Sequence, residues 1–132
     1  MKILLADDDR DQLSVRGLLL VHNGFRALEA SDRDSALRMA EAEHPECAVV
    51  DLRFPTEDVG LDLIRRLKAI DHHMRIVVLT GGDPAKLFGR IERGLIDEVI
   101  QKGSPAPLLM NSLKAFEASR REGFPGEARD DA

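Results

Sequence analysis

Short β-like runs recur along this chain at nearly regular intervals, and three of the five are nearly continuous apolar runs. Each run is followed by a segment whose apolar residues have helical spacing. The runs cover residues 3–6, 26–30, 47–50, 75–79 and 98–100, so neighbouring runs start 21 to 28 residues apart. That interval has room for one strand and one crossover helix. The alternation therefore predicts a single α/β domain with a parallel sheet and right-handed crossovers.

The segments between the runs carry helix start and stop signals. The first ends at Asn23-Gly24, a pair that terminates helices, and the fourth begins at Asp83-Pro84, a cap followed by proline at the first helical position. The first segment carries Leu13, Leu18, Leu19 and Val21. Because apolar residues at helical spacing usually face a core, we expect Leu87, Phe88 and Ile91 of the fourth segment to be buried.

Length and charge narrow the class of protein further. The 132 residues suffice for one domain, and the 24 acidic against 19 basic residues give a net charge of −5. This balance argues against direct binding to nucleic acid, which requires clustered Lys and Arg. The apolar stretch near the N-terminus is too short for a signal peptide, and no run approaches the length of a membrane span. We therefore expect a cytoplasmic domain that contacts no membrane.

Polar residues follow four of the five runs at the point where each ends. Asp7 and Asp8 follow the first, Asp51 the third, Thr80 the fourth, and Lys102 the fifth after one intervening residue. The carboxyl ends of parallel strands lie along one edge of a sheet, so we expect these side chains to converge. In the strand order 2-1-3-4-5, Asp8 and Asp51 would flank the point where the winding of the chain reverses.

These residue types together describe phosphoryl-transfer chemistry. Carboxylates held close together repel one another and need a cation, and oxygen ligands of this kind suit Mg²⁺. Lys102 offers a compact positive charge for phosphate oxygens, and Thr80 offers a hydroxyl donor. A carboxylate can itself be the nucleophile and form an aspartyl phosphate. Asp9, beside the cluster, is expected to cap the first helix.

Four motifs, in this order, resemble a two-component response-regulator receiver domain over residues 1–120. They are ILLADDD at 3–9, VVDLRFP at 49–55 with Gly60, VVLTG at 77–81, and IQK at 100–102. The resemblance implies a flavodoxin-like receiver fold with five parallel strands in the order 2-1-3-4-5 and helices on both faces. Residues 121–132, which lack periodicity, are expected to form a flexible C-terminal tail.

The resemblance also implies a phosphoacceptor and a metal site. Asp51 would receive the phosphoryl group from a sensor histidine kinase or a phosphotransfer protein. Asp8, Asp51 and the backbone carbonyl of Arg53 would ligate Mg²⁺ directly, and Asp7 would act mainly through a water molecule.

Three further residues would contact the phosphoryl group, and two positions depart from the family pattern. Thr80 would donate a hydrogen bond, Lys102 would form an ion pair, and Gly81 would leave room for the donor. Val99 stands where the family has an aromatic switch residue, and Gly103 stands where it has a proline in a cis peptide. Since glycine reaches unusual backbone conformations, Lys102 can still point inward.

The function implied is signalling without enzyme activity of its own. Phosphorylation would bias a two-state surface around the fourth helix, the fifth strand and the fifth helix. The output would pass to a separate protein or to an effector domain absent from this chain, and the domain would be a monomer or weak dimer.

Two alternatives share parts of the pattern. Val99 and Gly103 are compatible with a receiver-like module that docks partners without being phosphorylated. The Asp7-x-Asp9 motif also resembles the start of a haloacid-dehalogenase-type phosphatase, with Asp7 as nucleophile and Asp9 as general acid. The phosphatase interpretation leaves Asp51 unexplained.

Overall fold

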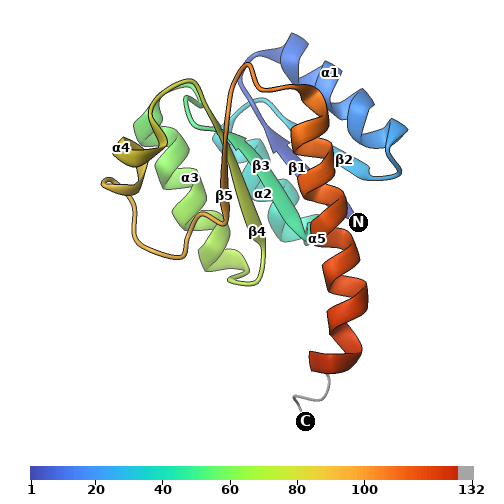
Figure 1. Ribbon diagram of the computed structural model, residues 1–132. Coiled ribbons are helices and arrows are strands. Elements are labelled where there is room, and N and C mark those ends of the chain that lie inside the picture. Colours follow the sequence, from blue (N-terminus) through green and yellow to red (C-terminus); the bar gives the residue numbers. More distant parts are fainter. Residues whose placement is uncertain (128–132) are drawn as a thin grey trace.

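The five apolar runs form one parallel sheet in the computed structural model, which describes residues 1–127 (Figure 1). Neighbouring strands pair in the order β2-β1-β3-β4-β5, and every pair is parallel. The predicted α/β class and strand order are confirmed. The strands are β1 (Lys2–Ala6), β2 (Arg26–Ala30), β3 (Cys47–Asp51), β4 (Arg75–Thr80) and β5 (Glu98–Gln101).

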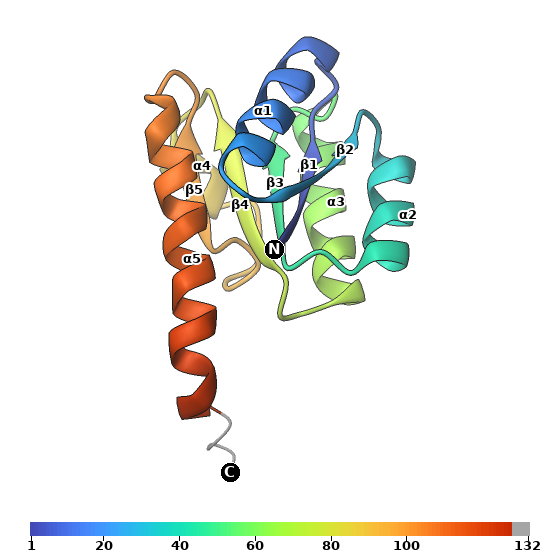
Figure 2. The same ribbon diagram turned by 90° about the vertical axis from the view of Figure 1, so that its right-hand side faces the viewer.

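Helices cover both faces of the sheet. Helices α1 and α5 lie on one face, and α2, α3 and α4 lie on the other (Figures 1 and 2). The helices are α1 (Arg10–His22), α2 (Arg33–Glu43), α3 (Glu57–Ile70), α4 (Pro84–Phe88) and α5 (Ala106–Glu127). Within residues 1–127, none of them combines the length and apolarity that a membrane span requires.

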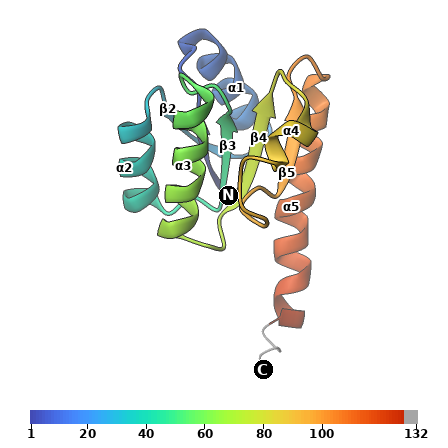
Figure 3. The same ribbon diagram turned by 90° about the vertical axis from the view of Figure 1, so that its left-hand side faces the viewer.

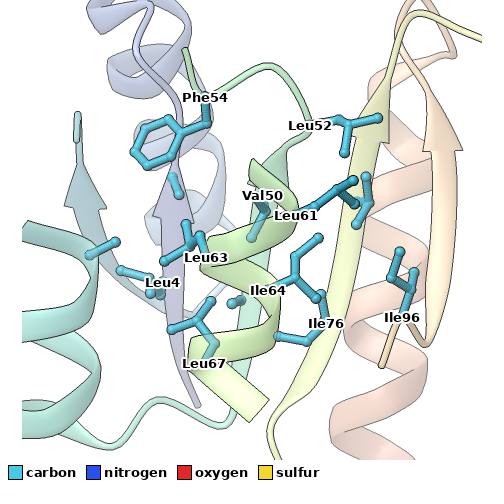
Figure 4. Packing of buried hydrophobic residues seen from close by; sticks show 14 of the residues in the cluster. Leu4, Val50, Leu52, Phe54, Leu61, Leu63, Ile64, Leu67, Ile76 and Ile96 are labelled. Carbon is cyan, nitrogen blue, oxygen red and sulfur yellow. The ribbon is translucent and has the colours of Figure 1, made fainter. Parts of the chain in front are cut away.

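Alternate residues of each strand enter two separate apolar clusters. Ile3 and Leu5 of β1 pack under α1 and α5, whereas Leu4 of the same strand packs toward α2 and α3. Figure 4 shows the second cluster, in which Leu4 lies near Leu63 of α3. Because both faces are covered, the three central strands β1, β3 and β4 are buried on both sides, and this explains why their sequences are nearly continuous apolar runs.

Only some of the apolar residues of α1 face the core. Leu13 and Leu20 are buried, whereas Leu18 and Val21 are 72% and 61% exposed. The buried side of the helix includes Gly17, where a Cβ atom would lie 2.0 Å from the Glu29 carboxylate of β2. The Glu29 carboxylate therefore occupies the space that a side chain at position 17 would fill.

Helix α4 is shorter than the sequence predicted. It ends at Phe88, which is exposed, and Ile91 is buried from the non-helical segment that follows. Ion pairs join that segment to α3, although the paired residues lie far apart in the sequence. Arg90 pairs with two carboxylates at the start of α3, and Lys68 Nζ of α3 lies 3.2 Å from Asp97 Oδ2.

Helix α5 continues to Glu127, so the expected domain boundary at residue 120 falls within a helix. The last part of the expected tail, residues 128–132, lies outside the described residues.

A close backbone approach explains the glycine at position 60. Gly60 lies in α3, and a Cβ atom on it would be 2.0 Å from the carbonyl oxygen of Leu52. Leu52 directly follows the last residue of β3, so this contact packs α3 against the start of the loop that follows the strand.

We predict that Gly60→Ala lowers the free energy of unfolding by about 1–3 kcal/mol, because the new methyl group must displace the Leu52 carbonyl. Urea denaturation monitored by circular dichroism measures the change. Gly81→Ala is the matched control, since a Cβ atom there meets nothing within 4 Å. Equal destabilisation by both substitutions would contradict this explanation.

Candidate functional site

The polar residues at the strand ends gather at the edge of the sheet toward which the strand arrows point (Figure 3). Asp7 and Asp8 lie in the loop after β1, and Asp51 is the last residue of β3. One carboxylate oxygen from each of these three residues lies within 4.8 Å of the others. Parallel pairing of Ala6 with Val50 causes this proximity, because it sets the residues that follow side by side.

Asp51 is buried and held by two hydrogen bonds. Its Oδ1 accepts one from the Arg53 backbone N–H at 3.2 Å, and its Oδ2 accepts one from Lys102 Nζ at 2.7 Å. The side chain is 6% exposed. Burial raises the pKa of Asp51 above its usual value, against the opposing effect of the Lys102 hydrogen bond, and the nearby Asp7 raises it further.

Lys102 points into the site although the family's proline is missing. Its backbone N–H donates to the Thr80 carbonyl at 2.7 Å, which ties the end of β5 to the end of β4. Gly103 follows with φ +91°, a left-handed conformation that glycine adopts without strain. The chain therefore turns away after Lys102, while its ammonium group reaches Asp51.

Both oxygens of Asp7 already have partners within the chain. Oδ1 accepts a hydrogen bond from the Asp9 backbone N–H at 2.9 Å, and Oδ2 lies 2.5 Å from Nη1 of Arg16. Asp9 caps α1, as predicted, by accepting from the backbone N–H groups of residues 11 and 12. Asp8, by contrast, is exposed at the mouth of the site.

Arg16 is the site residue that the sequence analysis missed. It lies on α1, three residues after the buried Leu13 and four before the buried Leu20. That spacing places it on the side of the helix that faces the sheet. The sequence carries this signal only once Leu13 and Leu20 are known to be the buried residues of α1.

Thr80 and Gly81 form the wall opposite the carboxylates. Thr80 is 5% exposed, and its Oγ1 accepts a hydrogen bond from the Gly82 backbone N–H at 3.0 Å. The space beside Gly81 is open, since a Cβ atom on it would contact nothing within 4 Å. A cleft extends from Asp51 and Arg53 to Gly81 and Lys102, with Glu57 at its margin.

The position of the family's aromatic residue is occupied by a small aliphatic side chain. Val99 lies in β5 opposite Val78 of β4 and is half-buried against the α3 side of the core. The whole sequence contains neither Tyr nor Trp.

The donor set fits a hard divalent cation. Asp7, Asp8 and Asp51 offer only oxygen atoms as ligands. The three carboxylates lie close enough together for one ion to contact all of them. Lys102 and Arg16 offset only part of this negative charge. The pocket can therefore hold a metal ion such as Mg²⁺.

Comparison with known sequences identifies the family. The family described as "Response regulator receiver domain" matches residues 3–114, so the chain belongs to the receiver domains of two-component response regulators. The response regulator MprA of Mycobacterium leprae is 35% identical over 132 residues, covering 98% of this chain and 55% of that protein. Sporulation initiation phosphotransferase F of Bacillus subtilis is 30% identical over 82 residues, covering 60% of this chain and 63% of that protein. The chain thus spans less than two thirds of these relatives.

Solved structures agree with the fold. A response regulator receiver domain protein from Clostridium thermocellum has a TM-score of 0.80 and 26% identity, with 93% of this chain and 97% of that chain covered. A response regulator from Burkholderia pseudomallei, described with a phosphorylated aspartic acid, a calcium ion and citrate, has a TM-score of 0.76 and 27% identity. The match covers 99% of this chain and 75% of that one. The resemblance to receiver domains is confirmed.

We predict that Asp51→Asn raises the free energy of unfolding at neutral pH by about 1–2 kcal/mol in a chelator-containing buffer, because it removes a buried charge whose partner Lys102 is partly exposed. The pKa of Asp51 is raised in the folded chain, so deprotonation favours the unfolded chain. The wild type therefore loses stability as pH rises through the folded-state pKa, and the gain from the substitution disappears at acidic pH. Urea denaturation of the wild type and of Asp51→Asn at acidic and at neutral pH measures both stabilities.

Asp32→Asn is the control for this prediction. Asp32 is an exposed helix cap, and its hydrogen bond from the Ser35 backbone N–H lowers its pKa, so its charge favours the folded chain. The control should show no gain at neutral pH. A gain in Asp51→Asn that is equal at neutral and acidic pH would contradict the electrostatic explanation.

Proposed function

We propose that this domain is the phosphoacceptor of a two-component system and that Asp51 receives the phosphoryl group from a histidine kinase or a phosphotransfer protein. The observation that carries the proposal is the contact of 2.7 Å between Lys102 Nζ and Asp51 Oδ2, beside the carboxylates of Asp7 and Asp8. This arrangement provides a nucleophile, a cation for phosphate oxygens and a set of metal ligands in one place.

In the proposed reaction, a carboxylate oxygen of Asp51 attacks the phosphorus atom of a phosphohistidine. The bond between phosphorus and the imidazole nitrogen breaks, and the nitrogen keeps the electron pair. Asp8, Asp51 and the Arg53 carbonyl would hold Mg²⁺, and the ion would supply positive charge against the phosphoryl oxygens. The product is an aspartyl phosphate on Asp51.

The remaining residues bind the phosphoryl group. Lys102 transfers its hydrogen bond from the Asp51 carboxylate to a phosphoryl oxygen, which carries more negative charge. Thr80 Oγ1 accepts a hydrogen bond from the Gly82 N–H, so its hydroxyl proton is available for donation to a second phosphoryl oxygen. The open space beside Gly81 admits the donor.

The relatives support this chemistry. The Burkholderia pseudomallei response regulator is described with a phosphorylated aspartic acid and a calcium ion, and a relative from Bacillus subtilis is named a phosphotransferase. For this chain we propose a cytoplasmic signalling role without enzyme activity of its own, as a monomer or weak dimer. The output would pass to a separate protein or an effector domain, through a surface formed by α4, β5 and α5.

One observation favours a second function. Val99 cannot perform the coupled rearrangement of a threonine and an aromatic residue that the family uses. A module that docks partners without phosphorylation would not need that rearrangement. The experiment below separates the two functions.

We predict that acetyl phosphate and Mg²⁺ add one phosphoryl group to the wild-type chain and none to Asp51→Asn, because Asp51 is the nucleophile. Intact mass spectrometry measures the adduct, which should be stable in acid and labile in alkali. Asp8→Asn should react at least tenfold more slowly, because it removes a proposed metal ligand.

Asp9→Asn is the matched control for Asp8→Asn, since asparagine keeps the helix cap. It should react at the wild-type rate. An unmodified wild type would leave the docking module as the function, and a phosphoryl group on Asp7 would indicate the phosphatase alternative.

We predict that Lys102→Ala still accepts a phosphoryl group but loses most of its conformational response, because no ammonium group draws β5 toward the phosphate. Amide NMR shifts of α4, β5 and α5 before and after phosphorylation measure the response. Shift changes as large as those of the wild type would mean that Lys102 does not carry the signal.

A further inference from the structure

The acidic pocket contains a second cation, contributed by α1. Nη1 of Arg16 lies 2.5 Å from Asp7 Oδ2 on the side of the pocket away from the cleft that opens beside Gly81. The Arg16 side chain is 19% exposed and that of Asp7 is 3% exposed, whereas Lys102 is 40% exposed. Arg16 is therefore the more deeply buried of the two cations that contact the carboxylates.

The side of this ion pair that faces the sheet is apolar. Arg16 and Asp7 are flanked by aliphatic side chains from three strands and from α1, namely Leu5, Ala6, Leu13, Val49 and Leu79. In such surroundings a charge is screened less than at the surface, so Arg16 acts on the pocket more strongly than an exposed arginine would. The helix cannot withdraw it easily, because its neighbours Leu13 and Leu20 are fixed in the core.

Two residues of the chain offset two of the three negative charges in the pocket. Asp7, Asp8 and Asp51 contribute three negative charges when ionised, and Arg16 and Lys102 contribute two positive charges. Arg16 also occupies one oxygen of Asp7, and the Asp9 N–H occupies the other. An entering divalent cation therefore meets a partly neutralised site in which Arg16 already engages Asp7 and Lys102 already engages Asp51.

We propose that Arg16 is a resident counter-charge that sets the divalent-cation affinity of the pocket, weakening it by competing for Asp7. This inference rests on the proposed function, since it concerns the same metal site. It assigns Arg16 as a positioning residue, which acts through Asp7 and does not itself contact the phosphoryl group. The consequence is a pocket that stays folded and closely packed without the cation and binds it weakly.

Calorimetric titration of the metal-free chain with Mg²⁺ tests the proposal. Arg16→Leu and Arg16→Gln should each bind Mg²⁺ about tenfold more tightly than the wild type, because both remove the positive charge. Arg16→Gln keeps a hydrogen-bond donor for Asp7, so it serves if the leucine variant fails to fold. Amide NMR spectra of each variant verify the fold.

Two further variants separate charge in the pocket from other effects. Arg16→Lys keeps the charge and should bind Mg²⁺ within about threefold of the wild-type affinity. Arg38→Gln removes an exposed arginine from α2 and should leave the affinity unchanged. Wild-type or weaker Mg²⁺ affinity in both Arg16→Leu and Arg16→Gln would overturn the proposal. Binding of Mg²⁺ by Arg16→Lys as tight as that of these two variants would also overturn it.

The outcome is distinguishable from a failure of the proposed function. Unchanged affinities in the Arg16 variants, with the wild type still phosphorylated on Asp51, would overturn the role of Arg16 alone. Absence of Mg²⁺ binding in the wild type and in every variant would overturn both the role of Arg16 and the proposed metal site.

Discussion

The parallel pairing of β1 with β3 is the constraint on which this site depends. Ala6 lies opposite Val50, so Asp7 and Asp51, which follow them, are forced together at the edge of the sheet with both side chains buried. Like charges at this distance oppose folding. The two apolar clusters on the faces of the sheet fix the strands in this register. The repulsion between the carboxylates therefore remains unless positive charges lie nearby.

Two cationic side chains from different elements reduce this repulsion. Lys102 reaches Asp51 from the end of β5, and Arg16 reaches Asp7 from α1. Lys102 is partly exposed on the cleft, where it can exchange its carboxylate partner for a phosphoryl oxygen. Arg16 is less exposed than Lys102 and is paired with the buried Asp7. The geometry thus gives the two cations different tasks, one in binding phosphate and one in adjusting the charge of the pocket.

Much of this arrangement could be predicted from the sequence. The alternation of strand-like runs with helical segments indicates a parallel sheet, and the polar residues that follow the runs must then meet at one edge of that sheet. Other features depend on contacts that no local pattern reveals. One such feature is the side of α1 that faces the sheet: Leu20 is buried and Leu18 is exposed, and this orientation brings Arg16 to Asp7. The early end of α4 accompanies ion pairs between segments about 30 residues apart.

The central claim is that the carboxylates form a cation site under electrostatic strain, and the dependence of stability on Mg²⁺ tests it most directly. Urea denaturation of the wild type at increasing Mg²⁺ should show the free energy of unfolding rising with the logarithm of concentration, because the ion binds only the folded chain. The double variant Asp8→Asn, Asp51→Asn should show no such rise. An equal rise in both proteins, or none in the wild type, would contradict the account.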